Sequence, residues 1–134
     1  MDQENKALLF VDLCGRYPYG IIVNFDGKKV CVDDIKFIRG DYYLTLKDTE
    51  KTYIGVDVER VKPYLHSLKS MTSAEKEEYQ KTFDTYENGM GTKLVYPSYQ
   101  TFDWLNAYHF DYRGLIELGL ALEAPQNMYI KKGE

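Results

Sequence analysis

Long apolar runs are missing from this chain. The longest, residues 7–11 and 118–122, are only a few residues long, whereas a helix that crosses a bilayer needs about 20 apolar residues. The first residues also lack the charged, apolar and small-residue pattern of a signal peptide. Both absences argue against a membrane protein and favour a cytoplasmic one.

Cysteine and histidine are scarce as well. Cys14 and Cys31 lie outside any C-x-x-C pair, and His66 and His109 are far apart in the chain. Four such residues without ligand spacing do not form a zinc motif. Two cysteines with apolar neighbours are typical of reduced, buried thiols, with a disulfide or a reactive thiol as the alternatives. We therefore expect no metal and no cofactor.

The chain also lacks a segment in which charges of one sign are concentrated. The chain has 17 basic and 21 acidic residues, net −4, and the two signs alternate along it. A protein that binds the phosphate backbone normally shows a basic stripe, because clustered cations release counterions on binding. No such stripe is visible, so nucleic acid is a disfavoured partner. The nearest candidates for a basic patch are Lys28, Lys29, Lys36 and Arg39.

Motifs for catalysis are also absent. The sequence has no G-x-S-x-G, G-x-G-x-x-G, P-loop or H-E-x-x-H pattern, so it predicts no enzyme and no catalytic residue. One compact polar cluster remains, formed by Asn106, His109, Asp111 and Arg113. It could hold a catalytic His–Asp pair or a metal. In the more ordinary interpretation His109 bonds a backbone group, Asp111 caps a helix and Arg113 pairs with Glu117.

Tyrosine, in contrast, is abundant. The chain has 13 tyrosines, where an average chain of this length has roughly four. Most fit a seam between sheet and helices, because tyrosine combines a large apolar ring with a hydroxyl that tolerates water. Tyr17 and Tyr42 have polar or turn neighbours and are predicted to be exposed. Aromatic residues at the loops of a small barrel can bind proline-rich peptides or stack on unpaired bases.

The first half of the chain, residues 1–70, predicts a short helix and a small antiparallel β-barrel. Asn5 and Gly15 are placed to begin and end a helix over 5–14. Alternating apolar residues then predict strands near 21–25, 30–37, 43–46 and 52–58, with a hairpin turn at Asp26-Gly27 and a bulge or bend at Asp33-Asp34. A fifth strand over 64–68 would close the barrel and cover its edge.

The second half, residues 71–134, predicts helices that pack on this barrel as one folding unit, giving an α+β fold. Thr72 and Glu75 form a capping box for a helix over 73–86. A glycine-containing loop over 87–97 follows, with a short extended piece at 93–96. Further helices are expected around Trp104 and over 112–118, and the tail after Pro125 is expected to fray.

Four segments carry a resemblance that covers most of the chain. They are D-L-C-G-R-Y-P-Y-G at 12–20, V-E-R-V-K-P-Y-L at 58–65, D-W-L-N-A-Y-H-F-D-Y-R-G-L-I-E at 103–117 and G-L-A-L-E-A-P at 119–125. They resemble a family of small uncharacterised proteins encoded by phages, prophages and mobile elements of gut anaerobic bacteria. The resemblance implies a genomic setting and no activity. By fold analogy alone, the predicted barrel is similar to Sm-like and Src-homology-like barrels, and a fold does not fix a function.

Three functions follow as hypotheses. The leading one is a non-enzymatic protein–protein interaction module of phage or mobile-element type. The second is a nucleic-acid-binding barrel that uses the exposed tyrosines with the four cations named above. The third is an enzyme centred on His109 and Asp111. The sequence does not give the partner or the oligomeric state.

Overall fold

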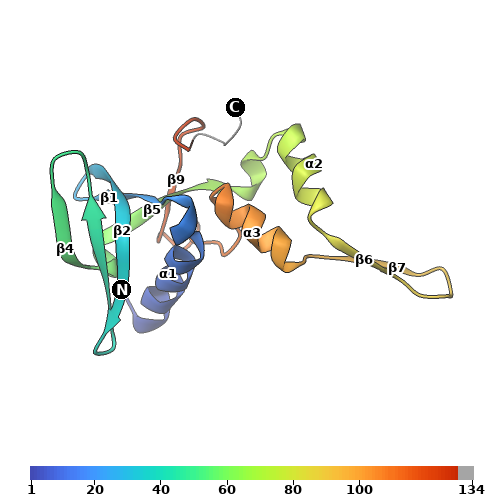
Figure 1. Cartoon of the computed structure of the whole chain (residues 1–134), viewed down its shortest axis with the longest axis horizontal. Coiled ribbons are helices and arrows are strands. Elements are labelled where there is room, and N and C mark those ends of the chain that lie inside the picture. The colour runs from blue at the N-terminus through green and yellow to red at the C-terminus, as the bar shows by residue number, and fades with distance from the viewer. Residues whose placement is uncertain (130–134) are drawn as a thin grey trace.

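The chain folds as one curved sheet with a helix against it, followed by two shorter helices and a separate hairpin (Figure 1). The structure is a computed structural model that describes residues 1–129. Its helices are α1 (Gln3–Arg16), α2 (Ser73–Lys81) and α3 (Tyr99–Ala107). Its strands are β1 (Ile22–Phe25), β2 (Lys28–Ile38), β3 (Asp41–Lys47), β4 (Thr52–Asp57), β5 (Val61–Ser67), β6 (Asp84–Glu87), β7 (Lys93–Tyr96), β8 (Phe110–Asp111) and β9 (Leu122–Glu123). The predicted α+β fold is confirmed.

The predicted barrel closure is wrong. The sheet runs in the order β4-β3-β2-β1-β5-β8, and β9 also pairs with β5. β5 pairs antiparallel with β1, and further along its length it pairs in parallel with β8 and β9. The amide of His66 donates to the carbonyl of His109 over 2.8 Å, and the amide of Ala124 donates to that of Leu65 over 2.7 Å. Because β5 pairs with β1 and with these two C-terminal strands and not with β4, β4 stays an edge strand of an open sheet in the described part of the chain.

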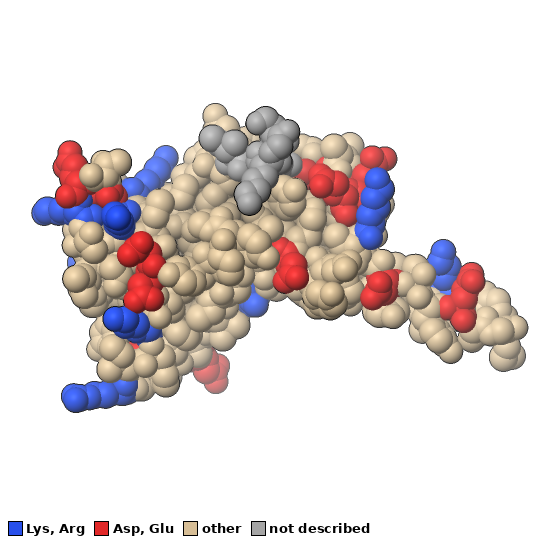
Figure 2. All heavy atoms as spheres, in the orientation of Figure 1, with Lys and Arg blue, Asp and Glu red and all other residues tan. Residues whose placement is uncertain are grey.

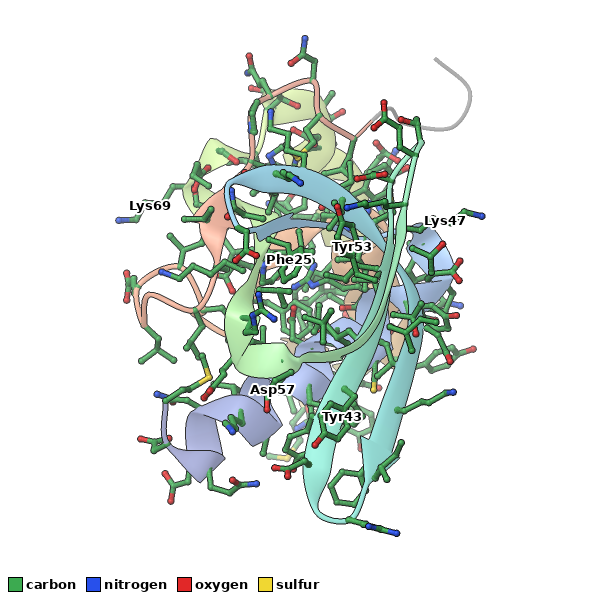
Figure 3. The ribbon with its side chains drawn as sticks, turned by 90° about the vertical axis from the view of Figure 1, so that its left-hand side faces the viewer. Phe25, Tyr43, Lys47, Tyr53, Asp57 and Lys69 are labelled. Atoms are coloured by element: carbon green, nitrogen blue, oxygen red, sulfur yellow. The ribbon has the colours of Figure 1, made fainter. Side chains whose placement is uncertain are left out.

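Local turn chemistry explains the hairpins. Asp26 and Gly27 both have positive φ, 50° and 81°, as a tight turn between β1 and β2 requires. The predicted bulge in β2 is present, since the register with β3 shifts between Val32 and Asp34. These features bend the sheet strongly. Phe25 and Tyr53 meet edge to face inside the bend, with ring centroids 5.2 Å apart (Figure 3).

The main core lies between α1 and the concave face of the sheet. α1 has an apolar face, and its Leu9 and Leu13 are fully buried with sheet residues such as Leu44, Leu46 and Val23. The helix begins earlier than expected, because Asp2 rather than Asn5 caps it, accepting from the amide of Asn5 over 2.8 Å. Gly15 lies inside the helix and does not end it. A Cβ there would lie 3.3 Å from Nδ2 of Asn106, so glycine lets α3 approach closely.

A second, smaller core lies between α2, α3 and β8. It consists of Met71, Leu105 and Phe110, with the rings of Tyr79, Trp104, Tyr108 and Tyr112 around them. The capping box of α2 is confirmed, although this helix ends at Lys81 instead of continuing to 86. Turns, and no long helix, occupy the region predicted as helix 112–118. Among the described residues, no helix is long and apolar enough to cross a membrane.

The hairpin β6–β7 extends away from everything else, at the right of Figure 1. Its two strands pair only with each other in the described part of the chain. We call residues 84–96 the arm, and we call α1, β1–β5, β8 and β9 the body. The short extended piece expected at 93–96 is confirmed as β7, and residues 130–134 of the predicted frayed tail lie outside the described residues.

Candidate functional site

The four predicted binding cations do not come together. Lys28 and Lys29 begin β2, whereas Lys36 and Arg39 lie at its other end, roughly 25 Å away at the usual rise per strand residue. Lys28 lies over the ring of Tyr53 and Lys29 over that of Tyr64. Lys36 lies 3.6 Å from a carboxylate oxygen of Asp34. The cations therefore lie apart, and three of them contact an aromatic ring or a carboxylate. Together they do not form the basic patch that nucleic-acid binding needs.

The two predicted binding tyrosines have local roles. Tyr17 is exposed as expected, and its hydroxyl donates to the backbone carbonyl of Asp33 over 2.5 Å. Tyr42 is half-buried, and its ring packs between those of Phe10 and Phe37 at 4.5 and 5.0 Å. Tyr17 therefore fixes the end of α1 to the bulge of β2, and Tyr42 belongs to the seam between α1 and the sheet.

The polar cluster of residues 106–113 takes part in a buried ion network that the sequence did not reveal. Arg16 and Asp12, one helical turn apart in α1, are fully buried and 2.8 Å apart. Arg113 reaches the other carboxylate oxygen of Asp12 over 2.7 Å, so the expected pair with Glu117 is replaced. Arg16 also donates to the carbonyl of Phe110 over 2.6 Å. This network connects α1 to the chain around β8.

Asp111 and His109 do not form a catalytic pair. Both carboxylate oxygens of Asp111 accept backbone amides, from Leu115 and Ile116, at 2.9 Å each. Asp111 therefore caps the turn that follows it, whereas the helix that it was expected to cap is replaced by turns. Asn106 accepts from the hydroxyl of Tyr112 over 3.0 Å. These bonds hold the segment 106–116 in shape, and both oxygens of Asp111 are bonded to backbone amides rather than to His109.

His109 occupies an unusual position. Its backbone φ is +59°, in the left-handed region that few residues other than glycine adopt. Burial and the nearby Arg16 lower the pKa of its imidazole to about 3, against a hydrogen bond to the backbone of Tyr19 that raises it. Within residues 1–129, Nδ1 of this buried ring has no hydrogen-bond partner. The imidazole is therefore neutral at physiological pH.

Tyr129 covers one face of this imidazole. The two rings are stacked, with centroids 3.6 Å apart. The Tyr129 hydroxyl accepts the amide of Ile22 over 3.1 Å and lies 2.8 Å from the carbonyl of Tyr64. Burial raises the pKa of this phenol, so it stays protonated. The described end of the C-terminal segment is thus bound to β1 and β5, which the sequence did not predict.

A cavity of about 790 Å³ adjoins these two rings. Its walls come from the turn after α1, from β5, from the start of α2, from the end of α3 and from the segment after β9. Among the lining residues are Tyr19, His66, Glu75, Tyr108, His109, Phe110, Glu123, Gln126 and Tyr129. No lysine or arginine belongs to the described lining. The described lining therefore combines aromatic rings with the carboxylates of Glu75 and Glu123.

The arm carries an exposed apolar surface. The pairing of Tyr86 with Leu94 and of Asp84 with Tyr96 puts Tyr86, Leu94 and Tyr96 on one face, because directly paired residues share a face. The exposed fractions are 57% for Tyr86, 56% for Leu94 and 61% for Val95, which lies on the other face. At the tip, Met90 is 90% exposed. We call these five residues, Tyr86, Met90, Leu94, Val95 and Tyr96, the arm surface.

The arm has few charges to balance this apolar area. Residues 84–96 contain Asp84, Glu87 and Lys93 as their only ionisable acids and bases besides the tyrosines, and Figure 2 shows the arm as mostly uncharged surface. At its base, a groove of about 440 Å³ is lined by Leu68, Met71, Lys76, Tyr79, Gln80, Phe83 and Val95. The apolar surface thus continues from the arm towards α2.

The described residues form neither a metal site nor a reactive thiol site. No group of three His, Cys, Asp or Glu side chains there could hold a metal ion. Cys14 and Cys31 are free thiols, but both are exposed, so their expected burial is wrong. Partial burial raises the pKa of the Cys14 thiol, which disfavours the reactive thiolate.

Comparison with known proteins adds no family. No model of a protein family matches this chain, and neither a curated protein nor a solved structure matches it. The resemblance to phage and mobile-element proteins and the Sm-like and Src-homology-like analogies therefore stay predictions.

Proposed function

We propose that this chain is a non-enzymatic protein–protein interaction module and that the arm surface is its binding surface. The observation that carries the proposal is the hairpin itself. It extends away from the body (Figure 1) and exposes more than half of the side chains of Tyr86, Leu94 and Val95. An isolated two-stranded hairpin is only marginally stable in water, and exposed apolar patches on soluble proteins commonly mark interfaces.

The partner that fits this surface is a protein segment in extended conformation. The outer edge of β7 pairs with no other strand in the described residues, so its backbone groups are available to an added strand. Such pairing supplies affinity through the main chain, and side chains on alternate positions supply specificity. Leu94 and Tyr96 on one face and Val95 on the other would contact alternating apolar side chains of that segment.

The charge of the arm argues against a nucleic-acid partner. Two acids and one base make its net charge −1, from Asp84, Glu87 and Lys93, whereas phosphate binding needs clustered cations. Non-obligate protein interfaces, in contrast, are enriched in tyrosine and methionine and depleted in charge at their centres. An origin in a phage or mobile element, expected from sequence resemblance, would make a host protein the partner to look for.

The proposal is tested by affinity capture with two matched variants of the full chain. Leu94→Asp places a charge on the arm surface, and Ile54→Asp places one on β4, at the open edge of the body, where Ile54 is 82% exposed. We expect wild type and Ile54→Asp to retain the same partner protein and Leu94→Asp to lose it. Sedimentation of the purified chain shows whether that partner is a second copy.

Two results would contradict the proposal. One is the absence of any protein that binds wild type and not Leu94→Asp. The other is a partner that Ile54→Asp loses as completely as Leu94→Asp does, because the body edge and not the arm would then be the interface.

A further inference from the structure

The groove at the base of the arm is continuous with the arm surface, because Val95 belongs to both. Its volume is about 440 Å³, within the range of ligand pockets, which are concave, mostly apolar and supplied with a few polar groups. Its lining comes from the segment before α2, from α2 and the residues that follow it, and from β7. The groove therefore lies where the arm meets the rest of the chain.

One face of α2 forms a wall of this groove. Lys76, Tyr79, Gln80 and Phe83 all belong to the lining, and their spacing places them on the same side of a helix. The helical turn continues to Phe83, whose amide donates to the carbonyl of Gln80 over 3.3 Å. The rings of Tyr79 and Phe83 meet edge to face, with centroids 5.1 Å apart. The wall is thus aromatic, with one cation at its end.

The groove lies on the β7 side of the arm. Thr85 of β6 and Val95 of β7 are directly paired and therefore share a face of the hairpin, yet only Val95 belongs to the lining. The outer edge of β7 pairs with no other strand in the described residues. A strand added to this edge would have one residue paired with Val95, and the side chain of that residue would lie on the groove face.

Charge defines what the groove accepts besides apolar groups. Lys76 is the only charged residue in the described lining, which contains no acid. Within residues 1–129, Lys76 forms no salt bridge. Complementary charges set the specificity of an interface. The groove therefore complements a segment that combines a large apolar side chain with a carboxylate.

We infer that the groove recognises one large apolar side chain of an extended partner segment, together with an acidic residue two positions along that segment. The inference rests on the proposed function, because it takes the segment to be a strand added to β7. The apolar side chain belongs to the residue paired with Val95 and packs against Tyr79 and Phe83. Residues two positions apart in a strand lie on one face, so the carboxylate lies on the same side and meets the ammonium group of Lys76.

The test is a selection from a library of random nine-residue peptides, displayed on yeast, against the full purified chain. We expect enriched peptides to carry leucine, methionine or phenylalanine at one position and aspartate or glutamate two positions away. Lys76→Glu should change the second preference to lysine or arginine. The matched control is Lys81→Glu, which reverses a charge on α2 outside the described lining and should leave both preferences unchanged.

The affinity of one enriched peptide for further variants separates the two parts of the groove. Lys76→Glu should weaken binding at least about threefold, since an exposed attraction becomes a repulsion. Gln80→Trp fills the groove and should weaken binding at least about tenfold, because the apolar side chain of the peptide stays in water. Glu77→Trp adds the same ring to α2 outside the described lining and should leave binding unchanged. Both substituted positions are exposed, so both variants are expected to fold.

The inference is overturned if enriched peptides show no acidic preference, or if Gln80→Trp binds them as tightly as wild type. It is also overturned if no peptide is enriched. A wild-type dimer that Gln80→Trp abolishes would overturn it as well, because the occupant would then be a second copy. Peptides that Leu94→Asp loses and the groove variants retain would support the arm as the interface and remove the groove from it. Failure of the inference and failure of the proposed function are therefore distinguishable.

Discussion

Strands β3 and β7 contain similar residues and have opposite environments. β3 includes Tyr43-Leu44-Thr45-Leu46, and β7 includes Leu94-Val95-Tyr96. Leu44 and Leu46 are 1% and 0% exposed, whereas Leu94 is 56% exposed. β3 lies inside the sheet between β2 and β4, and α1 packs against its face. Among the described residues, β7 pairs only with β6.

This difference separates what stabilises the chain from what it offers to a partner. In the body, apolar burial on folding is the main favourable term, worth roughly 25 cal/mol for each Å² removed from water. In the arm the same residue types stay largely exposed to water, so they contribute little of this free energy to folding. We therefore expect substitutions in the body to change stability and substitutions in the arm to change binding.

The largest expected effect concerns the buried ion network. Asp12→Asn leaves Arg16 without its carboxylate in a fully buried site, and breaking a buried pair in this way typically costs about 3–5 kcal/mol. The free energy of unfolding, measured in urea, should fall by that amount. The matched control is Asp26→Asn in the exposed pair of Asp26 with Arg60, where the loss should stay below about 1 kcal/mol. Equal losses would mean that the network does not anchor α1.

Next in size is the direct comparison of the two strands. Leu46→Ala removes a fully buried side chain and should lower the free energy of unfolding by about 2–5 kcal/mol. Leu94→Ala removes an exposed one and should change it by no more than about 0.5 kcal/mol. Urea titrations of both variants provide the numbers. A large loss of unfolding free energy in Leu94→Ala would show that Leu94 stabilises the fold as a core residue does, and the contrast between the two strands would not hold.

Acid pH should destabilise the body through His109. The pKa of its imidazole is about 3 in the folded chain and about 6.5 when unfolded, so below pH 6.5 the unfolded state binds a proton that the folded state does not. Stability therefore falls as the pH falls, by roughly 2 kcal/mol between pH 7.5 and pH 5 from this group. The fall attributable to His109 is the difference between wild type and His109→Phe in urea titrations at both pH values. Parallel pH profiles of the two proteins would refute the assignment.

A smaller effect is expected at the start of α2, the helix that precedes the arm. Thr72 accepts the amide of Glu75 over 3.1 Å in the capping box, and loss of such a cap costs about 1 kcal/mol. Thr72→Ala should lose this amount, whereas Thr72→Ser keeps the hydroxyl and should lose little. Thermal unfolding of the three proteins measures the difference. Equal midpoints for Thr72→Ala and wild type would show that the cap is not needed.

Much of the local structure could be predicted from the sequence. Periodicity and turn residues located the hairpin-linked strands, the Asp26-Gly27 turn and the capping box of α2, because these depend on neighbours in the chain. Barrel closure could not be predicted in this way. Whether β5 pairs with β4 or with the C-terminal segments depends on contacts such as His66 with His109, which are far apart in sequence.

The site was harder to predict for the same reason. Nothing near Asp12 indicates that Arg113 reaches it from the other half of the chain, or that Tyr129 stacks on His109. The arm, in contrast, had a signal that periodicity alone could have given. Tyr86, Leu94 and Tyr96 flank a segment with two glycines, Gly89 and Gly91, a pattern that favours a hairpin. Its exposure, however, depends on the absence of a covering element and is visible only in the fold.

The central claim is that the arm, and not the open edge of the body, contacts a partner. It is tested most directly by placing a photo-crosslinking amino acid at position 94 in one protein and at position 54 in another, and irradiating cells that contain each. Both positions are exposed strand residues, so chance collisions should be similar. We expect a discrete crosslinked protein from position 94 and none from position 54. A discrete product from position 54 alone, or from neither position, would contradict it.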